Sequence, residues 1–297
     1  MSKIIVITGP TGVGKTKLSI ELAKKYNGEI INADSMQVYK ELNIGTAKIK
    51  EEEKENIFHH LFDIKSVNEE YSIYNYQKDC RKKIEEIESK NKTPILVGGT
   101  GLYIKSALYD YKLDYNNNTN NYDNLTKEEL YEKLIALDKD IVDKIDKNNK
   151  RRLINAINYY EKNNKSIIHN KTNELLYDVV FIGLTTNREN LYNIINNRVD
   201  KMIEMGLVDE VYKFYQNKIY TKPLIGGIGY KELYEYFDNK ISLEVAIENI
   251  KKNSRRYAKK QYTFFNHQIP VIWFDTNYNN FNITVNEVCE YINKITK

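Results

Sequence analysis

The sequence predicts an α/β fold of the P-loop NTPase type, in which helices flank a parallel sheet and a helical insertion interrupts the core. Two observations predict it. Short apolar runs alternate with helical segments along the chain, and a glycine-rich motif follows the first apolar run. Such alternation is typical of a parallel sheet with right-handed crossovers. The 297 residues are enough for one large domain with an insertion or for two modest domains.

Five segments have the apolar pattern of strands buried in a parallel sheet. They are residues 3–8, 29–33, 93–97, 178–184 and 271–274. Residues 17–26 are expected to form a helix with Leu18 and Leu22 on its inner face. Residues 72–90 form a second predicted helix, because Ser72 is suited to cap its start.

Residues 113–177 interrupt this alternation, so we predict a core of residues 1–112 and 178–297 with a helical insertion between them. The insertion opens with an Asn-rich run at 116–121, which is typical of a loop. Thr126 and Glu129 have the spacing of a capping box that starts a helix. A second helix is expected at 151–161, and no internal repeat is visible.

Composition limits the class of protein. Hydrophobic residues make up 41% and charged residues 29%, as in ordinary globular proteins. We expect a cytoplasmic protein, because no apolar run approaches the roughly 20 residues of a membrane span and no signal peptide is recognisable. Cys80 and Cys289 indicate neither a metal cluster nor a disulfide framework. The net charge of +4 is compatible with a nucleic-acid partner but does not establish one.

The glycine-rich motif carries the clearest chemistry. It fits the pattern G-x-x-x-x-G-K-[ST] with Gly9, Pro10, Thr11, Gly12, Val13, Gly14, Lys15 and Thr16. Its glycines let backbone N–H groups surround phosphate oxygens at the positive end of a helix. Lys15 supplies a charge, and the Thr16 hydroxyl is placed for a phosphate oxygen or a bound Mg²⁺. We therefore expect a diphosphate or triphosphate ligand.

The position of the acidic residues favours group transfer over hydrolysis. Enzymes that hydrolyse nucleoside triphosphates usually place an aspartate after a later strand to hold Mg²⁺. Here residues 93–97 lead into Gly98-Gly99-Thr100, whereas Asp34 follows the second predicted strand. A base near a bound diphosphate suits a reaction in which diphosphate leaves. By its position alone, Asp34 could equally be a helix N-cap.

Six further motifs follow the P-loop in order. They are DSMQVY at 34–39, GTAK at 45–48, HHLFD at 59–63, GGTGLY at 98–103, GYKEL at 229–233 and RYAKKQYT at 256–263. Together with the P-loop they resemble the tRNA dimethylallyltransferases, also called tRNA isopentenyltransferases or IPP transferases, over residues 9–265. That family transfers a dimethylallyl group from dimethylallyl diphosphate to N6 of adenosine-37 in tRNA, just 3′ of the anticodon, and releases diphosphate.

The resemblance implies a role for each matching residue. The implied catalytic residues are Asp34, Thr100 and Lys15. The residues implied to bind the diphosphate or nucleotide are Gly9, Pro10, Thr11, Gly12, Val13, Gly14, Lys15, Thr16 and Arg256. Those implied to bind tRNA are Asp34, Ser35, Met36, Gln37, Thr100, Arg151, Arg152, Gly229 and Lys231. Thr16 is also the implied metal contact, with Mg²⁺ as cofactor. Asp34 would accept the proton of the adenine amine, and the adenosine must be flipped out of its stack. The implied partners are tRNA and dimethylallyl diphosphate, and nothing indicates more than a monomer.

Two rows of basic residues at four-residue spacing, 251/255/259 and 252/256/260, predict one cationic helix face suited to phosphate; a solvated charged face is the alternative. The chain also departs from the family pattern. Asn155 and Asn158 stand where the family has a basic and an acidic residue, and Lys260 and Phe264 replace the usual Arg and Trp. These departures concern the grip on tRNA. The adjacent His59 and His60 are expected to be structural, because neighbours in an extended segment point to different sides.

Three other functions remain open on the residues. A small-molecule kinase would need an acid on Mg²⁺ and an Arg-rich lid, and the lid is not evident. A prenyltransferase acting on free adenine nucleotides would not need a basic helical insertion. A non-catalytic RNA-binding protein would not need Lys15, Thr16 and Asp34 to be intact.

Overall fold

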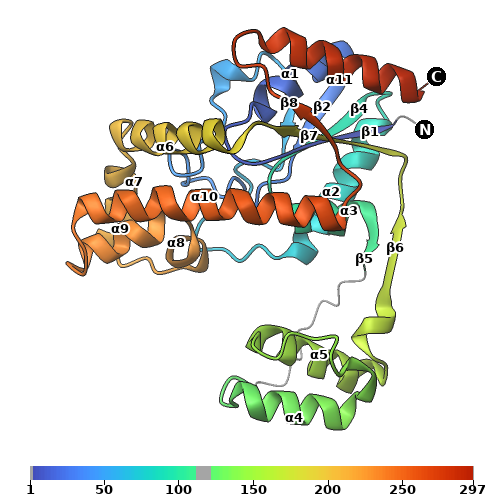
Figure 1. Cartoon of the computed structure of the whole chain (residues 1–297), viewed down its shortest axis with the longest axis vertical. Helices are drawn as coiled ribbons and strands as arrows, with labels where there is room; N and C mark the ends of the chain where they lie inside the picture. Colours follow the sequence, from blue (N-terminus) through green and yellow to red (C-terminus); the bar gives the residue numbers. More distant parts are fainter. Residues whose placement is uncertain (1–2, 112–121, 297) are drawn as a thin grey trace. The chain divides into compact units, whose positions relative to one another are not determined.

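The computed structural model describes residues 3–111 and 122–296, which form two compact units (Figure 1). Unit 1 comprises Met1–Ala107 and Tyr177–Lys297, and unit 2 is Leu108–Leu176. The insertion therefore begins before the predicted residue 113, because strand β5 (Tyr109–Tyr111) pairs with strand β6 (Lys171–Leu175) inside unit 2. The Asn-rich run at 116–121 lies outside the described residues.

Unit 1 is built on a six-stranded sheet with the order β3-β2-β4-β1-β7-β8 and parallel pairing throughout. The strands are β1 (Ile4–Thr8), β2 (Gly28–Asn32), β3 (His59–His60), β4 (Thr93–Val97), β7 (Val179–Thr185) and β8 (Ile272–Asp275). The predicted α/β class is confirmed, and each of the five predicted strands lies within one residue of its observed bounds. The additional strand β3 has only two residues, too few for an apolar pattern.

Helices on both sides of this sheet complete unit 1 (Figure 1). They are α1 (Lys15–Lys25), α2 (Ile73–Glu88), α3 (Gly101–Leu108), α6 (Arg188–Glu204), α7 (Leu207–Gln216), α8 (Lys222–Gly226), α9 (Tyr230–Phe237), α10 (Leu243–Gln268) and α11 (Phe281–Thr296), with a 3₁₀ turn at Glu51–Glu53. The two predicted helices of the core are confirmed. Leu18 and Leu22 of α1 are fully buried, and the Ser72 hydroxyl accepts the Asn75 N–H at the start of α2.

Two hydrophobic cores stabilise unit 1. One lies against the sheet and joins β1, β7, α1 and α11, with Ile7, Leu18 and Val288 among its buried members. The other joins the helices α6 to α10 to residues 36–44, with Val38, Leu42 and Tyr230 among its buried members. The second core therefore fixes a segment that directly follows β2 against helices that lie more than a hundred residues later in the chain.

Unit 2 has its own small core beneath two helices, α4 (Lys127–Leu137) and α5 (Lys150–Asn163). Its buried members are Leu130, Leu134, Ile141, Leu153, Ala156 and Ile157. The predicted capping box is confirmed: the Glu129 N–H donates to the Thr126 hydroxyl and the Thr126 N–H to the Glu129 carboxylate. Short 3₁₀ turns at Lys139–Ile141 and Ile167–Asn170 complete the unit. Among all helices described here, none has the length and apolar character of a membrane span.

Candidate active site

The candidate site lies at the carboxyl ends of three neighbouring strands. The P-loop follows β1, Asp34 follows β2, and Gly98-Gly99-Thr100 follow β4, which lies between the other two. Ligands of open parallel sheets bind at this edge. A cavity of about 1190 Å³ opens here, and both Lys15 and Asp34 border it.

The P-loop closes around the ammonium group of its own lysine. Lys15 Nζ donates to the carbonyl oxygens of Gly9 at 2.9 Å and Pro10 at 2.6 Å. Gly14 has a φ of +93°, and a Cβ added there would lie 2.7 Å from the Phe281 ring of α11. The loop therefore needs glycine at this position both for its backbone conformation and for its packing. Thr16 borders the cavity and is exposed, as a metal or phosphate contact requires.

The charge on Lys15 is costly where the structure places it. Burial and, to a lesser extent, the nearby positive charge of Arg198 lower the pKa of Lys15 to about 7, although the negative charge of Asp34 acts in the opposite direction. Burial also lowers the pKa of Arg198. Two cations are thus crowded into a desolvated place with one carboxylate nearby. A polyanion bound there would relieve this repulsion and stabilise both charged forms.

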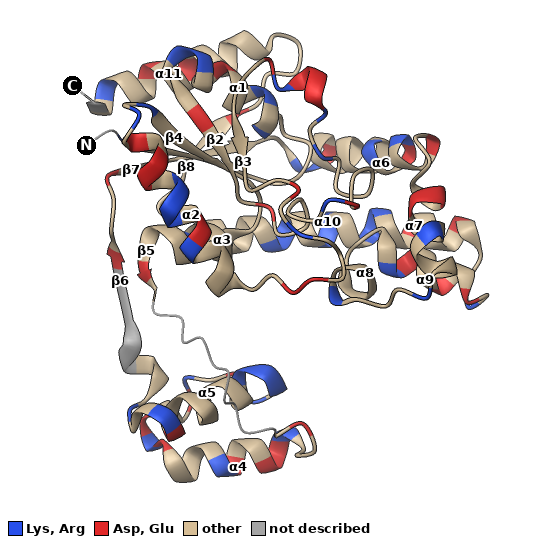
Figure 2. Ribbon diagram, turned by 180° about the vertical axis from the view of Figure 1, so that it is seen from behind, with Lys and Arg blue, Asp and Glu red and all other residues tan. Residues whose placement is uncertain are grey.

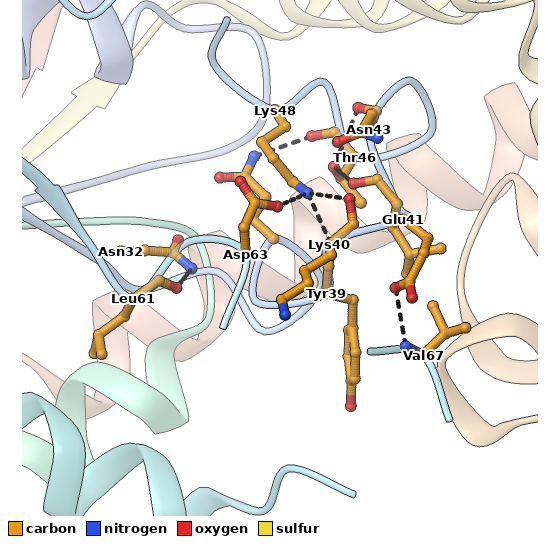
Figure 3. A network of polar contacts seen from close by, with 12 residues as sticks. Asn32, Tyr39, Lys40, Glu41, Asn43, Thr46, Lys48, Leu61, Asp63 and Val67 are labelled. Carbon is orange, nitrogen blue, oxygen red and sulfur yellow. Dashed lines mark hydrogen bonds and ion pairs between the residues drawn. The ribbon is translucent and has the colours of Figure 1, made fainter. Parts of the chain in front are cut away.

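Asp34 is held in a local turn. Its backbone N–H donates to Asn32 Oδ1 at 2.8 Å, and its Oδ1 accepts the Met36 N–H at 2.9 Å. Asn32 in turn donates to the Leu61 carbonyl at 3.0 Å (Figure 3). The carboxylate therefore caps its own turn and not a helix, since the chain after β2 continues in turns as far as the 3₁₀ turn at Glu51–Glu53. This removes the helix N-cap interpretation and leaves Asp34 as an oriented carboxylate at the cavity.

Thr100 is tied to the same turn. Its Oγ1 accepts the Ser35 N–H at 3.0 Å, and its own N–H donates to the Ala33 carbonyl at 3.1 Å. Gly98 and Gly99 border the cavity, whereas Thr100 is not among its lining residues. The hydroxyl thus joins the ends of β2 and β4 beside Asp34, and direct contact between Thr100 and a substrate stays a prediction.

Most of the other predicted contacts of the core gather around the cavity. Ser35, Met36, Gln37, Gly229 and Lys231 all border it. The Gln37 amide is fixed by a hydrogen bond from its Nε2 to the Thr46 carbonyl at 3.0 Å. Segments separated by nearly two hundred residues, after β2 and before α9, are therefore brought to one place.

Three predicted arginine contacts are not among the residues that line the cavity. Arg256 is exposed on α10 and does not border the cavity; Ser254, Tyr257, Lys260 and Gln261 of the same helix do. Arg151 and Arg152 are exposed at the start of α5 in unit 2, whereas the residues lining the cavity belong to unit 1. The roles of these three arginines stay predictions.

The predicted single cationic face of α10 is wrong in part. Figure 2 shows Lys and Arg distributed along this helix. Lys251 forms an ion pair with Asp200 of α6 at 2.8 Å, and Arg255 donates to Asn196 of the same helix. These two side chains face a neighbouring helix, because α6 packs along α10. They are therefore satisfied within the protein.

Sequence reasoning missed Arg198 and Tyr257. Arg198 of α6 borders the cavity and its Nη2 donates to the Thr46 carbonyl at 3.3 Å. It lies next to the inward face marked by the buried Leu191, Ile195, Val199 and Met202, and an arginine beside such a face is a usable signal. Tyr257 also borders the cavity; desolvation and, to a lesser extent, the negative charge of Asp34 raise its pKa to about 12.

This chain is similar to known proteins over nearly its whole length. Residues 37–268 match the family model described as IPP transferase. The chain belongs to the IPP transferase family. Two curated relatives of this IPP transferase are tRNA dimethylallyltransferases. That of Anoxybacillus flavithermus is 48% identical over 98% of this chain and 96% of its own length, and that of Bacillus velezensis is 50% identical over 92% and 90%.

Solved structures of IPP transferases share the fold. The tRNA isopentenylpyrophosphate transferase of Bacillus halodurans superposes with a TM-score of 0.78 and 39% identity, covering 99% of this chain and 96% of that one. A eukaryotic dimethylallyltransferase acting on tRNA gives a TM-score of 0.80 and 33% identity, covering 92% of this chain and 74% of that one. The family resemblance drawn from the motifs is therefore confirmed.

Proposed function

We propose that this protein transfers a dimethylallyl group from dimethylallyl diphosphate to N6 of adenosine-37 in tRNA. The observation that carries the proposal is that an anion-binding loop and an oriented carboxylate, Asp34, border one cavity with only the end of β4 between them. This arrangement suits a reaction in which an amine loses a proton while diphosphate departs. The relatives named tRNA dimethylallyltransferases support the same substrate pair.

The diphosphate end of the donor fits the P-loop. Loop amides, Lys15 and Arg198 supply positive charge that is already in place and partly desolvated. Such pre-organised charge stabilises the negative charge that develops on a leaving group. Because Lys15 has a pKa of about 7, diphosphate binding should draw a proton onto it above that pH.

The transfer step involves the P-loop and Asp34 together. The lone pair of N6 forms a bond to C1 of the dimethylallyl group as the C1–O bond breaks and its electron pair leaves with diphosphate. Asp34 accepts the proton lost by N6, and the Met36 N–H keeps its carboxylate oriented during this step. N6-(dimethylallyl)adenosine and diphosphate are the products.

We also propose that Mg²⁺ accompanies the diphosphate. Among the residues that the structure describes, no three His, Cys, Asp or Glu side chains are grouped to hold a metal. The exposed Thr16 hydroxyl at the P-loop fits a hard cation that is bound chiefly by phosphate oxygens and water. When bound, the ion would neutralise charge on the leaving diphosphate.

The proposed tRNA contacts come from residues at the cavity and from unit 2. A flipped adenosine would enter beside Ser35, Met36 and Gln37, and Thr100 is joined to Ser35 by a hydrogen bond. Lys231 at the cavity and the exposed Arg151 and Arg152 of unit 2 supply positive charge for the phosphate backbone. We further propose that the protein acts as a monomer in the cytoplasm, where tRNA is available.

One assay tests the proposal. The protein is incubated with Mg²⁺, dimethylallyl diphosphate and unmodified tRNA, and the tRNA is digested and analysed by mass. The expected product is N6-(dimethylallyl)adenosine at one position of the anticodon loop. Product with AMP but none with tRNA would replace tRNA by a free nucleotide as acceptor. Phosphate transfer from ATP without prenyl transfer would instead indicate a kinase.

A further inference from the structure

The loop of residues 42–48 borders the cavity but supplies none of the side chains used in the proposed reaction. Gly45, Thr46 and Ala47 all border the cavity. The Thr46 carbonyl accepts hydrogen bonds from Gln37 Nε2 at 3.0 Å and from Arg198 Nη2 at 3.3 Å. The position of this single oxygen therefore determines where two side chains lie: Gln37 at the proposed adenosine end of the cavity and Arg198 at the diphosphate end.

One side of the loop is anchored by a buried ammonium group (Figure 3). The Lys48 side chain is only 5% exposed, and its Nζ donates to the Tyr39 carbonyl at 2.7 Å and pairs with Asp63. The Thr46 hydroxyl donates to the Leu42 carbonyl at 2.8 Å, which closes the loop on itself. These contacts all join residues that lie close together in sequence.

The other side is held by one carboxylate from α7. Glu210 Oε2 accepts the N–H groups of Asn43 at 3.2 Å and Ile44 at 2.8 Å, and Oε1 accepts that of Gly45 at 3.2 Å. Oε1 also accepts the Tyr230 hydroxyl at 2.7 Å. Charge-assisted bonds of this kind are about twice as strong as neutral ones. One side chain thus satisfies three consecutive backbone donors immediately before Thr46.

Tyr230 makes the arrangement rigid. Its side chain is fully buried, and a Cβ added to Gly45 would lie 2.6 Å from its ring, so loop and ring are in direct contact. Burial and the negative charge of Glu210 raise the pKa of Tyr230, so its hydroxyl remains a donor to the carboxylate. Any shift of Glu210 would move the loop and the Thr46 carbonyl with it.

We infer that Glu210 is a positioning residue of the active site, which acts through the Thr46 carbonyl to place Arg198 and Gln37 for diphosphate and adenosine. The identity of these two ligands rests on the proposed function. The coupling between Glu210 and Arg198 does not, because any anion in the P-loop would sense it. Glu210 holds residues 43–45 and Arg198 contacts the next residue, Thr46, so the loop connects the two side chains.

The first experiment compares Glu210→Gln with Asp209→Asn. Both residues lie in the first turn of α7, so each substitution removes one negative charge from the same helix end, but Asp209 is exposed. Inorganic diphosphate binding is measured by calorimetry, together with the thermal midpoint of each variant. We expect Glu210→Gln to bind diphosphate about tenfold more weakly. Asp209→Asn should bind like the unmodified protein, and the thermal midpoints show whether each variant is folded at the temperature of the titration.

The second experiment tests the route of the effect with a double-mutant cycle. Arg198→Lys keeps the charge but loses the planar group that reaches the Thr46 carbonyl. If Glu210 acts through that contact, adding Glu210→Gln to Arg198→Lys should weaken diphosphate binding by less than about twofold further. Tyr230→Phe removes one donor to Glu210 without removing the ring, so it should weaken binding in the same direction but less, even if Glu210→Gln folds poorly.

Two results would overturn the inference. One is a double variant whose loss of diphosphate affinity equals the product of the losses in the two single variants, because Glu210 and Arg198 would then act independently. The other is unchanged diphosphate binding in both Glu210→Gln and Tyr230→Phe, which would make the contact a matter of folding alone. If the unmodified protein forms no prenylated tRNA but the cycle shows coupling, the proposed function fails and this inference stands.

Discussion

Two loops border the same cavity and are built in different ways. The P-loop is closed by its own lysine, whose ammonium group donates to carbonyls only five and six residues earlier. The loop of residues 42–48 is held by Glu210 and Arg198, whose contacts span 152 to 167 residues. The contacts that close the first loop therefore lie within its short motif, whereas Glu210 and Arg198 lie far from the GTAK motif of the second loop.

The difference follows from what each loop does. A phosphate cradle needs backbone N–H groups, glycines that permit their curvature and one cation, all of which fit in a single turn. Placing one carbonyl between two side chains from different elements needs supports from those elements. A loop of the second kind depends on packing between α6, α7 and α9, and a substitution far away in sequence can disturb it.

The largest effect is expected from removing the Asp34 carboxylate, which lies outside both loops and which no group in either loop can replace. Asp34→Asn keeps an oxygen for the Met36 N–H, so the turn should survive, but it removes the base. We expect prenylated tRNA to form about 10²- to 10⁴-fold more slowly. The rate of product formation is measured by mass analysis. Binding of tRNA, measured by filter retention, should be unchanged. Loss of tRNA binding in a folded variant would make Asp34 a structural residue.

The locally encoded loop can be broken at one glycine. In Gly14→Ala the new Cβ would meet Phe281 at 2.7 Å in a left-handed backbone, so the loop must distort. We expect a loss of about 1–3 kcal/mol in the free energy of unfolding and failure to bind diphosphate. Gly226→Ala is the matched control for chemical denaturation, because its Cβ would meet no atom within 4 Å. Equal stability of the two variants would contradict the prediction.

The buried charge of Lys15 lowers the stability of the folded protein in a way that depends on pH, and this gives a further test of the P-loop. The pKa of Lys15 falls from 10.5 to about 7 on folding, so between these values the unfolded chain binds more protons. Its effect on stability is therefore a penalty, present in full below pH 7 and lost as pH rises toward 10.5. Lys15→Met should thus gain stability relative to the unmodified protein at pH 6 and lose that gain by pH 10 in urea titrations. A difference independent of pH would contradict this assignment.

The smallest expected effect tests strain in the second loop. Ala47 has a φ of +44°, a left-handed conformation that costs an L-residue about 1–2 kcal/mol. Ala47→Gly relieves this strain but makes the unfolded chain more flexible, so the free energy of unfolding should rise by at most about 1 kcal/mol. Urea denaturation measures it. A clear fall in stability would show that packing of the Ala47 methyl group outweighs the strain.

Much of the fold was predictable because its signals are local. Five apolar runs gave five strands of the sheet, and Ser72 and Thr126 marked helix starts through bonds to residues three positions later. Strand β3 escaped detection because two residues carry no periodicity, and β5 with β6 because their pairing joins the two ends of the insertion. The site was predictable where motifs directly follow strands, as at Lys15 and Asp34.

By itself the sequence determined the P-loop, five of the strands and the family. Each of these depends on neighbouring residues, on backbone propensity and on motifs that survive in one dimension. Only the tertiary structure decided that Arg198 reaches the cavity, that Lys251 and Arg255 face α6, and that Glu210 holds the loop before Thr46. A charged side chain looks the same in sequence whether it faces water or a partner. Burial and the distance to that partner give it its role, and both arise only when the helices pack.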